Sequence, residues 1–125
     1  MQKRTIFSGA AVLLSASLWL MSQPALAHAH LKSSQPAENA EVDASPQTLS
    51  LSFTEEVEPA FSGVTLLDSQ QQKVAIGKAQ LDAGQHSRLI LPLNAPLAAG
   101  DYQVNWHVLS VDGHKTQGSY RFRVK

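Results

Sequence analysis

The stretch "DYQVNWHVLS", which runs from Asp101 to Ser110, decides the fold predicted for this chain. Apolar and polar residues alternate in it, so the apolar side chains project from one side of an extended strand. The residues on that side are Tyr102, Val104, Trp106 and Val108. This period-two pattern predicts a β-strand with one buried side and one solvent-facing side.

Two other segments alternate in the same way. The segment "TLSLSF" (Thr48 to Phe53) places three apolar residues on one side, namely Leu49, Leu51 and Phe53. The C-terminal "SYRFRVK" (Ser119 to Lys125) combines an apolar side with a basic one. Its inward residues are predicted to be Tyr120, Phe122 and Val124, and its outward residues Arg121, Arg123 and Lys125. Both patterns indicate strands that cover a common core.

Shorter β-rich runs fill the middle of the chain. They read "GVTLLDS", "KVAIGKAQL" and "RLILPL", and each is followed by a polar or turn-forming stretch. The segment "PAENAEVDASP" (36–46) is predicted to be an irregular connection. Short strands with turn signals at this spacing predict an all-β fold of about seven strands. We expect a β-sandwich or small barrel, immunoglobulin-like or cupredoxin-like.

The first 27 residues have the features of an export signal. Lys3 and Arg4 precede the apolar run 6–21, and Ala25 and Ala27 supply the small residues that signal peptidase reads. The run is short for a membrane-spanning helix, which needs about 20 apolar residues. We expect a signal peptide at 1–27 and a single domain at 28–125 that begins with His28. An uncleaved membrane anchor is the alternative.

Cleavage changes the composition of the chain. It removes Lys3 and Arg4, so eight Lys and Arg face ten Asp and Glu, a net charge of −2 with neutral histidines. This balance provides no general basic surface for nucleic acid. The chain has no cysteine, and both methionines lie in the leader, so thiolate and thioether ligands are excluded. With no second hydrophobic segment, we expect a periplasmic protein that is not embedded in the membrane.

Cleavage also gives His28 two metal donors on one residue, its α-amine and its ring Nδ1. The amine has an ordinary pKa of about 7.7–8.0, so a metal displaces its proton at modest cost at neutral pH. Any residue left ahead of His28 would convert the amine to an amide and abolish this chelate.

A second group of donors lies in "SVDGHKTQG" (110–118). Asp112 and His114 are two residues apart, so in an extended segment they project to the same side. With the two nitrogens of His28 they make a set of three nitrogens and one oxygen, which suits tetragonal Cu(II).

Each of these features has another interpretation. "DG" between two strands is a common hairpin turn, which needs no metal. The start "HAH" could instead wrap Cu(II) with the amine, two deprotonated backbone amides and the His30 ring, unless hydrogen bonds already hold those amides. His86 in a polar loop and His107 on the polar side of its strand are expected to be surface histidines.

The chain from His28 to Lys125 resembles the CopC family of periplasmic copper-binding proteins. The resemblance rests on "HAHLKSSQPAENAEV", "LSFTEEVEPAFSGVTLLD" and "YQVNWHVLSVDGHKTQGSYRFRV". It implies a Greek-key β-sandwich or barrel that binds one Cu(II) per chain through a histidine brace. By position, the brace is the amine and ring of His28 with the ring of His114, and Asp112 is the carboxylate. Glu55 would support the site, and His30 is a further candidate ligand.

The sequence departs from the family in one respect. Members with a Cu(I) site carry it in a methionine-rich central region, which here reads "DSQQQKVAIGKAQL" without methionine or histidine. We therefore expect a Cu(II) site only.

Three functions are compatible with these features. The first is non-enzymatic: a monomeric periplasmic Cu(II)-binding protein for copper homeostasis or resistance. The resemblance implies an inner-membrane copper permease of the CopD type as its partner. The second is a copper-dependent enzyme of the lytic polysaccharide monooxygenase type. The third is an immunoglobulin-like structural module whose N-terminal histidine is incidental. We expect the first.

Overall fold

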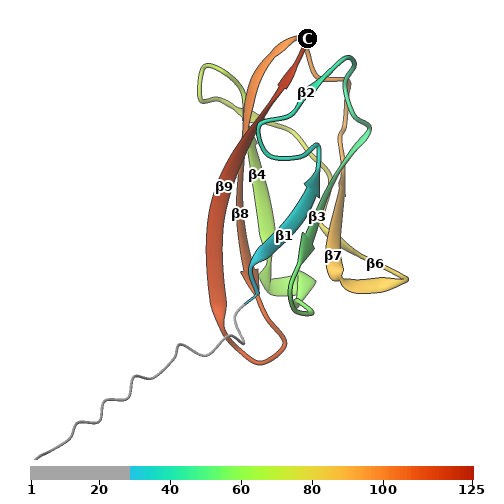
Figure 1. The fold of residues 1–125 in the computed structure, drawn as a ribbon, viewed down its shortest axis with the longest axis vertical. Coiled ribbons are helices and arrows are strands. Elements are labelled where there is room, and N and C mark those ends of the chain that lie inside the picture. The colour runs from blue at the N-terminus through green and yellow to red at the C-terminus, as the bar shows by residue number, and fades with distance from the viewer. Residues whose placement is uncertain (1–28) are drawn as a thin grey trace, which may run out of the picture.

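The computed structural model describes residues 29–125, which form a sandwich of two β-sheets (Figure 1). The strands of the first sheet are, in spatial order, β1 (Leu31–Gln35), β3 (Thr48–Phe53), β7 (Gln85–Pro92) and β6 (Gln80–Asp82). Those of the second are β2 (Glu41–Val42), β9 (Lys115–Val124), β8 (Gly100–Leu109), β4 (Gly63–Leu67) and β5 (Lys73–Val74). A single 3-10 turn, η1 (Pro59–Phe61), precedes β4. The predicted all-β sandwich is confirmed, and seven of the described strands are at least three residues long.

The core lies between the two sheets and is made by the alternation read from the sequence. Every residue predicted to face inward on β3, β8 and the C-terminal strand is buried. These residues are Leu49, Leu51, Phe53, Tyr102, Val104, Trp106, Val108, Tyr120, Phe122 and Val124. Phe53 and Trp106 meet edge to face across the sheets, with ring centroids 5.1 Å apart. Burial of each such side chain contributes about 1.5–3 kcal/mol to folding.

Two local predictions need correction. The run "KVAIGKAQL" is not one strand but two, β5 and β6, which belong to different sheets. Gly77 lies between them, and a Cβ there would come within 2.4 Å of the Pro92 ring, so the chain crosses closely packed against β7. The connection 36–46 is irregular except for β2, which pairs in parallel with the end of β9.

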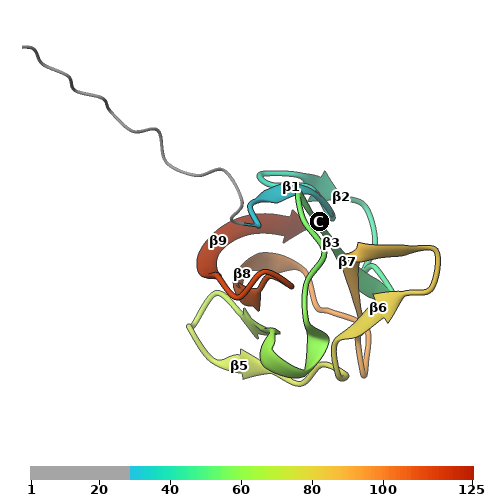
Figure 2. The same ribbon diagram turned by 90° about the horizontal axis from the view of Figure 1, so that it is seen from below.

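The long hairpin of β8 and β9 places its turn at one end of the sandwich, opposite the C-terminus (Figure 1). β1 begins where β3 ends, since Leu31 pairs with Phe53. Both strand ends lie at the end of the sandwich that carries this turn (Figure 1). Seen along the sandwich, β1 lies next to β9, where the two sheets approach each other (Figure 2). The start of the described chain and the hairpin turn therefore lie at the same end. Within residues 29–125, no helix is long and apolar enough to cross a membrane.

Gly118 makes room for the Trp106 indole, since a Cβ on it would lie 2.6 Å from Trp106 Cζ2. We predict that Gly118→Ala lowers the free energy of unfolding by about 1–3 kcal/mol, the usual cost of overpacking a core. Thermal unfolding followed by Trp106 fluorescence measures the loss. The control is Gly84→Ala, where the nearest atom, Asp82 Oδ1, is 3.8 Å from the added Cβ. Equal melting temperatures for the two variants would contradict this packing argument.

Candidate metal centre

The turn between β8 and β9 is built by Ser110 to His114. The Ser110 N–H donates to the His114 carbonyl (2.9 Å), and the Gly113 N–H donates to the Ser110 carbonyl (2.9 Å). Gly113 has a φ of 95°, in the left-handed region that favours glycine. The segment is therefore a tight turn, as the "DG" pattern indicates. It is not the extended segment in which Asp112 and His114 were expected to project to the same side. The turn nevertheless brings Asp112 and His114 together.

Asp112 and His114 form a partly exposed pair. Asp112 Oδ1 lies 3.1 Å from His114 Nδ1, and the two side chains are 33% and 50% exposed. The hydroxyl of Ser110, a residue only 1% exposed, donates a hydrogen bond to the same oxygen. That hydroxyl lowers the pKa of Asp112 below its ordinary value, and the His114 ring and N–H lower it further, against a smaller opposing effect of burial. The carboxylate form is therefore the one present at neutral pH.

The contacts between the two side chains involve one oxygen of Asp112 and one ring nitrogen of His114. Among the described residues, every hydrogen bond to the Asp112 carboxylate goes to Oδ1. Nδ1 of His114 faces that oxygen, so Nε2 is the ring nitrogen directed elsewhere. A ligating histidine commonly bonds a carboxylate through its other ring nitrogen, which fixes the orientation of the ring. Asp112 can thus orient His114 through Oδ1 and offer Oδ2 as a ligand.

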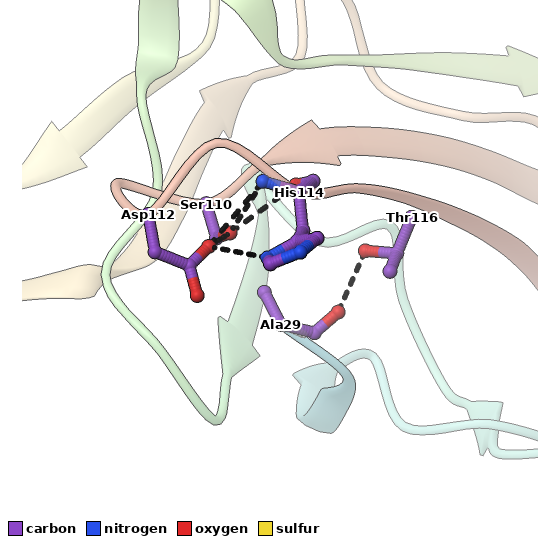
Figure 3. A network of polar contacts seen from close by, with 5 residues as sticks. All are labelled: Ala29, Ser110, Asp112, His114 and Thr116. Atoms are coloured by element: carbon purple, nitrogen blue, oxygen red, sulfur yellow. Dashed lines mark hydrogen bonds and ion pairs between the residues drawn. The ribbon is translucent and has the colours of Figure 1, made fainter. Parts of the chain in front are cut away.

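The first described residue is held against this turn. The Thr116 hydroxyl donates a hydrogen bond of 2.6 Å to the Ala29 carbonyl, across 87 positions of sequence. Ala29 itself is 0% exposed and belongs to the core. Figure 3 shows the Ala29 side chain pointing toward the His114 ring, which is joined to Asp112 at its edge. The backbone immediately after His28 is therefore fixed next to the Asp112–His114 pair.

The next residue is held from the other sheet. The His30 N–H donates to Thr54 Oγ1 (3.0 Å), and the Thr54 N–H donates to the His30 carbonyl (2.9 Å). These bonds extend the pairing of β1 with β3 by one step beyond Leu31. The His30 side chain is exposed, but its backbone is committed to Thr54.

The other residues singled out in the sequence fall into three groups. His28 lies outside the described residues. Glu55 follows Thr54 and is half-buried, and its carboxylate makes no ion pair or hydrogen bond to another described residue. His86 and His107 are exposed, as expected, and the His107 ring packs over Gly63. Among residues 29–125, no group of three or more His, Asp or Glu side chains is arranged to hold a metal.

The sequence interpretation missed two supporting residues, Thr116 and Thr54, and gave Ser110 no role. For Ser110 and Thr116, the alternation of the strands could have indicated this role. Ser110 continues the inward register of Trp106 and Val108 on β8, and Thr116 continues that of Tyr120 on β9. A hydroxyl at an inward position must find a hydrogen-bond partner, which marks such positions for a polar role.

Comparisons with known proteins identify a family and several relatives. Residues 31–125 match the family model of the CopC domain. The chain is 42% identical over 113 residues to protein YobA of Escherichia coli K12, covering 90% of this chain and 86% of YobA. It is 40% identical over 121 residues to copper resistance protein C of Xanthomonas campestris pv. juglandis, covering 91% of each chain.

The fold also matches a solved structure. The crystal structure of CopC from Methylosinus trichosporium OB3b superimposes with a TM-score of 0.73 at 37% sequence identity, covering 78% of this chain and 94% of that one. The family match spans the β-sandwich and includes the Asp112–His114 turn. The chain belongs to the CopC family.

Proposed function

We propose that this protein is a periplasmic Cu(II)-binding protein of copper homeostasis or resistance. It binds one Cu(II) through the amine and ring of His28, the ring of His114 and the carboxylate of Asp112. The structural observation on which this proposal mainly rests is the hydrogen bond from Thr116 to the Ala29 carbonyl. This bond holds the start of the described domain beside the Asp112–His114 pair. Family membership supports a role with copper independently.

Covalent geometry supplies the step from Ala29 to the metal. The Cα of His28 is about 3.8 Å from that of Ala29 across a trans peptide. In Figure 3 the Ala29 side chain points toward the His114 ring. This supports our inference that the amine and ring of His28 reach one ion that also contacts His114. Two histidines and a carboxylate from the turn and the N-terminus give the three-nitrogen, one-oxygen set that suits Cu(II).

The choice of oxidation state follows from the ligands. Soft sulfur ligands favour Cu(I), whereas nitrogen and oxygen ligands suit Cu(II). Residues 28–125 contain neither cysteine nor methionine. We therefore assign no Cu(I) site to the domain.

The remaining parts of the proposal concern the life of the protein in the cell. The leader 1–27 directs export and is removed, so that the domain 28–125 works in the periplasm as a monomer. Its copper passes to an inner-membrane permease of the CopD type. These statements rest on the sequence of the leader and on the family resemblance.

The proposed role is not enzymatic. The alternative of a polysaccharide monooxygenase has no support, because the relatives and the structure that match are CopC-family proteins. Such an enzyme would also need exposed aromatic residues for a sugar chain. Tyr102, Trp106 and Tyr120 are instead buried, with 6%, 8% and 3% of their surfaces exposed.

We predict that the protein starting at His28 binds one equivalent of Cu(II) at neutral pH and releases it on acidification to about pH 5, because protons compete with the metal for imidazole and amine nitrogens. Titration against a chromogenic Cu(II) chelator measures stoichiometry and affinity at each pH. Zinc, which lies below copper in the affinity order, serves as the comparison metal. The absence of a stoichiometric Cu(II) site at neutral pH would contradict the proposed function.

A further inference from the structure

We infer that three residues, Ala29, Thr54 and Thr116, form an N-terminal clamp that determines how the first residues of the domain bind copper. The clamp holds the chain extended, so that copper is bound jointly with His114 and not wrapped by "HAH" alone. This inference rests on the proposed function and assigns positioning roles to Thr54 and Thr116.

The start "HAH" carries two incompatible copper sites. In the brace, the metal takes the amine and ring of His28 and reaches across to His114. In the wrapped form, it takes the same amine, the backbone nitrogens of Ala29 and His30, and the His30 ring. Both forms need the His28 amine, so a given chain adopts one or the other.

The wrapped form demands a backbone that curls around the ion. The nitrogens of Ala29 and His30 must point at one metal in a plane with the amine. In the structure, the His30 nitrogen instead points at Thr54 Oγ1, 3.0 Å away, and the His30 carbonyl accepts from the Thr54 N–H. Wrapping would require the His30 N–H to give up its bond to Thr54, because that nitrogen must lose its proton to the metal.

The second part of the clamp acts one residue earlier. Ala29 is 0% exposed, and its carbonyl accepts the 2.6 Å bond from Thr116. Its nitrogen can join a planar copper site only if this buried residue moves toward the ion, a movement that the bond from Thr116 opposes. Thr116 lies on β9 of the second sheet, whereas Thr54 directly follows β3 of the first, so they hold adjacent residues of the N-terminal segment from two sides. The bond from Thr116 that opposes wrapping also holds Ala29, the residue next to His28 in the chain, on the side of the turn where the His114 ring lies (Figure 3).

The clamp makes a specific prediction about replacement of its hydroxyls. The double variant Thr54→Val/Thr116→Val, starting at His28, is expected to bind Cu(II) in the brace about tenfold more weakly, the scale of one or two lost hydrogen bonds. A second, four-nitrogen species should appear in its EPR spectrum. Adding His30→Ala to the double variant should remove that species, since the wrapped form needs the His30 ring.

Four further single variants make the result specific. Thr116→Ser retains a hydroxyl and should keep the wild-type spectrum, whereas Thr116→Val should not. Thr48→Val is the matched control, because Thr48 is an exposed threonine at the other end of β3. If the double variant does not fold, the single variant Thr54→Val at the exposed site serves in its place. In copper-free Thr54→Val, hydrogen exchange of the His30 amide should be faster than in the wild-type protein.

The outcomes distinguish the clamp from the function on which it rests. A wild-type spectrum that changes with His114→Ala supports the brace. If that holds and the valine variants keep both the wild-type spectrum and affinity, the clamp is wrong and the proposed function stands. If the wild-type protein itself shows four nitrogens and ignores His114→Ala, both are wrong.

Discussion

Replacing His114 with alanine is expected to weaken Cu(II) binding more than a hundredfold and to change the EPR spectrum. Loss of a residue that merely supports a metal ligand already costs roughly 10–100-fold in affinity, and His114 is proposed as a ligand. The variant also removes the ring toward which the Ala29 side chain points (Figure 3). Competition against a chelator of known affinity measures the change.

His86→Ala is the matched control for this prediction. His86 is exposed, and its backbone carbonyl, which accepts from the Val57 N–H, is unchanged by the substitution. It should leave affinity and spectrum as in the wild-type protein. Equal Cu(II) affinities for His114→Ala and the wild type would mean that the turn is not part of the copper site.

Extending the chain by Gly-Ser-Gly-Ser ahead of His28, so that no histidine occupies the third position, is expected to weaken Cu(II) binding by a similar factor, more than a hundredfold. The extension converts the α-amine to an amide, which keeps its proton at neutral pH and so no longer serves as a ligand in the brace. Metal ligands must be deprotonated, so this single covalent change removes one of the four proposed donors. Affinity and EPR spectrum are measured as for His114→Ala.

The control carries Gly-Ser-Gly-Ser after Lys125 instead. This end of β9 lies opposite the hairpin turn (Figure 1), so the added residues should change nothing at the site.

The two predictions differ in which mode of copper binding each variant excludes. The extension eliminates both the brace and the wrapped form, whereas His114→Ala eliminates only the brace. Unchanged affinity in the N-terminally extended protein would mean that copper binds without the His28 amine.

Much of the fold could be predicted because it depends on a local pattern. On β8, the alternation that ends with Trp106 and Val108 specifies which side is buried, and the structure has the same side in the core. The split of "KVAIGKAQL" into β5 and β6 could not be predicted this way. It depends on the approach of Gly77 to Pro92, a contact between segments that local patterning does not encode.

The proposed ligands of the candidate site could be predicted from the sequence, but the residues that hold the N-terminal segment in place could not. Asp112 and His114 are close in sequence, and their chemistry is apparent without the fold. The bond between Thr116 and Ala29 joins residues 87 positions apart, so only the sandwich brings them together. The conformation of "HAH" likewise depends on Thr54, which pairs with His30 only after β1 joins β3.

The most direct test of the account is a copper anomalous difference map from crystals of the copper-loaded protein that starts at His28. The account predicts one peak per chain, bonded to the amine and ring of His28 and to the ring of His114, with the Asp112 carboxylate at its side. A peak surrounded by the backbone nitrogens of Ala29 and His30, away from His114, would contradict it.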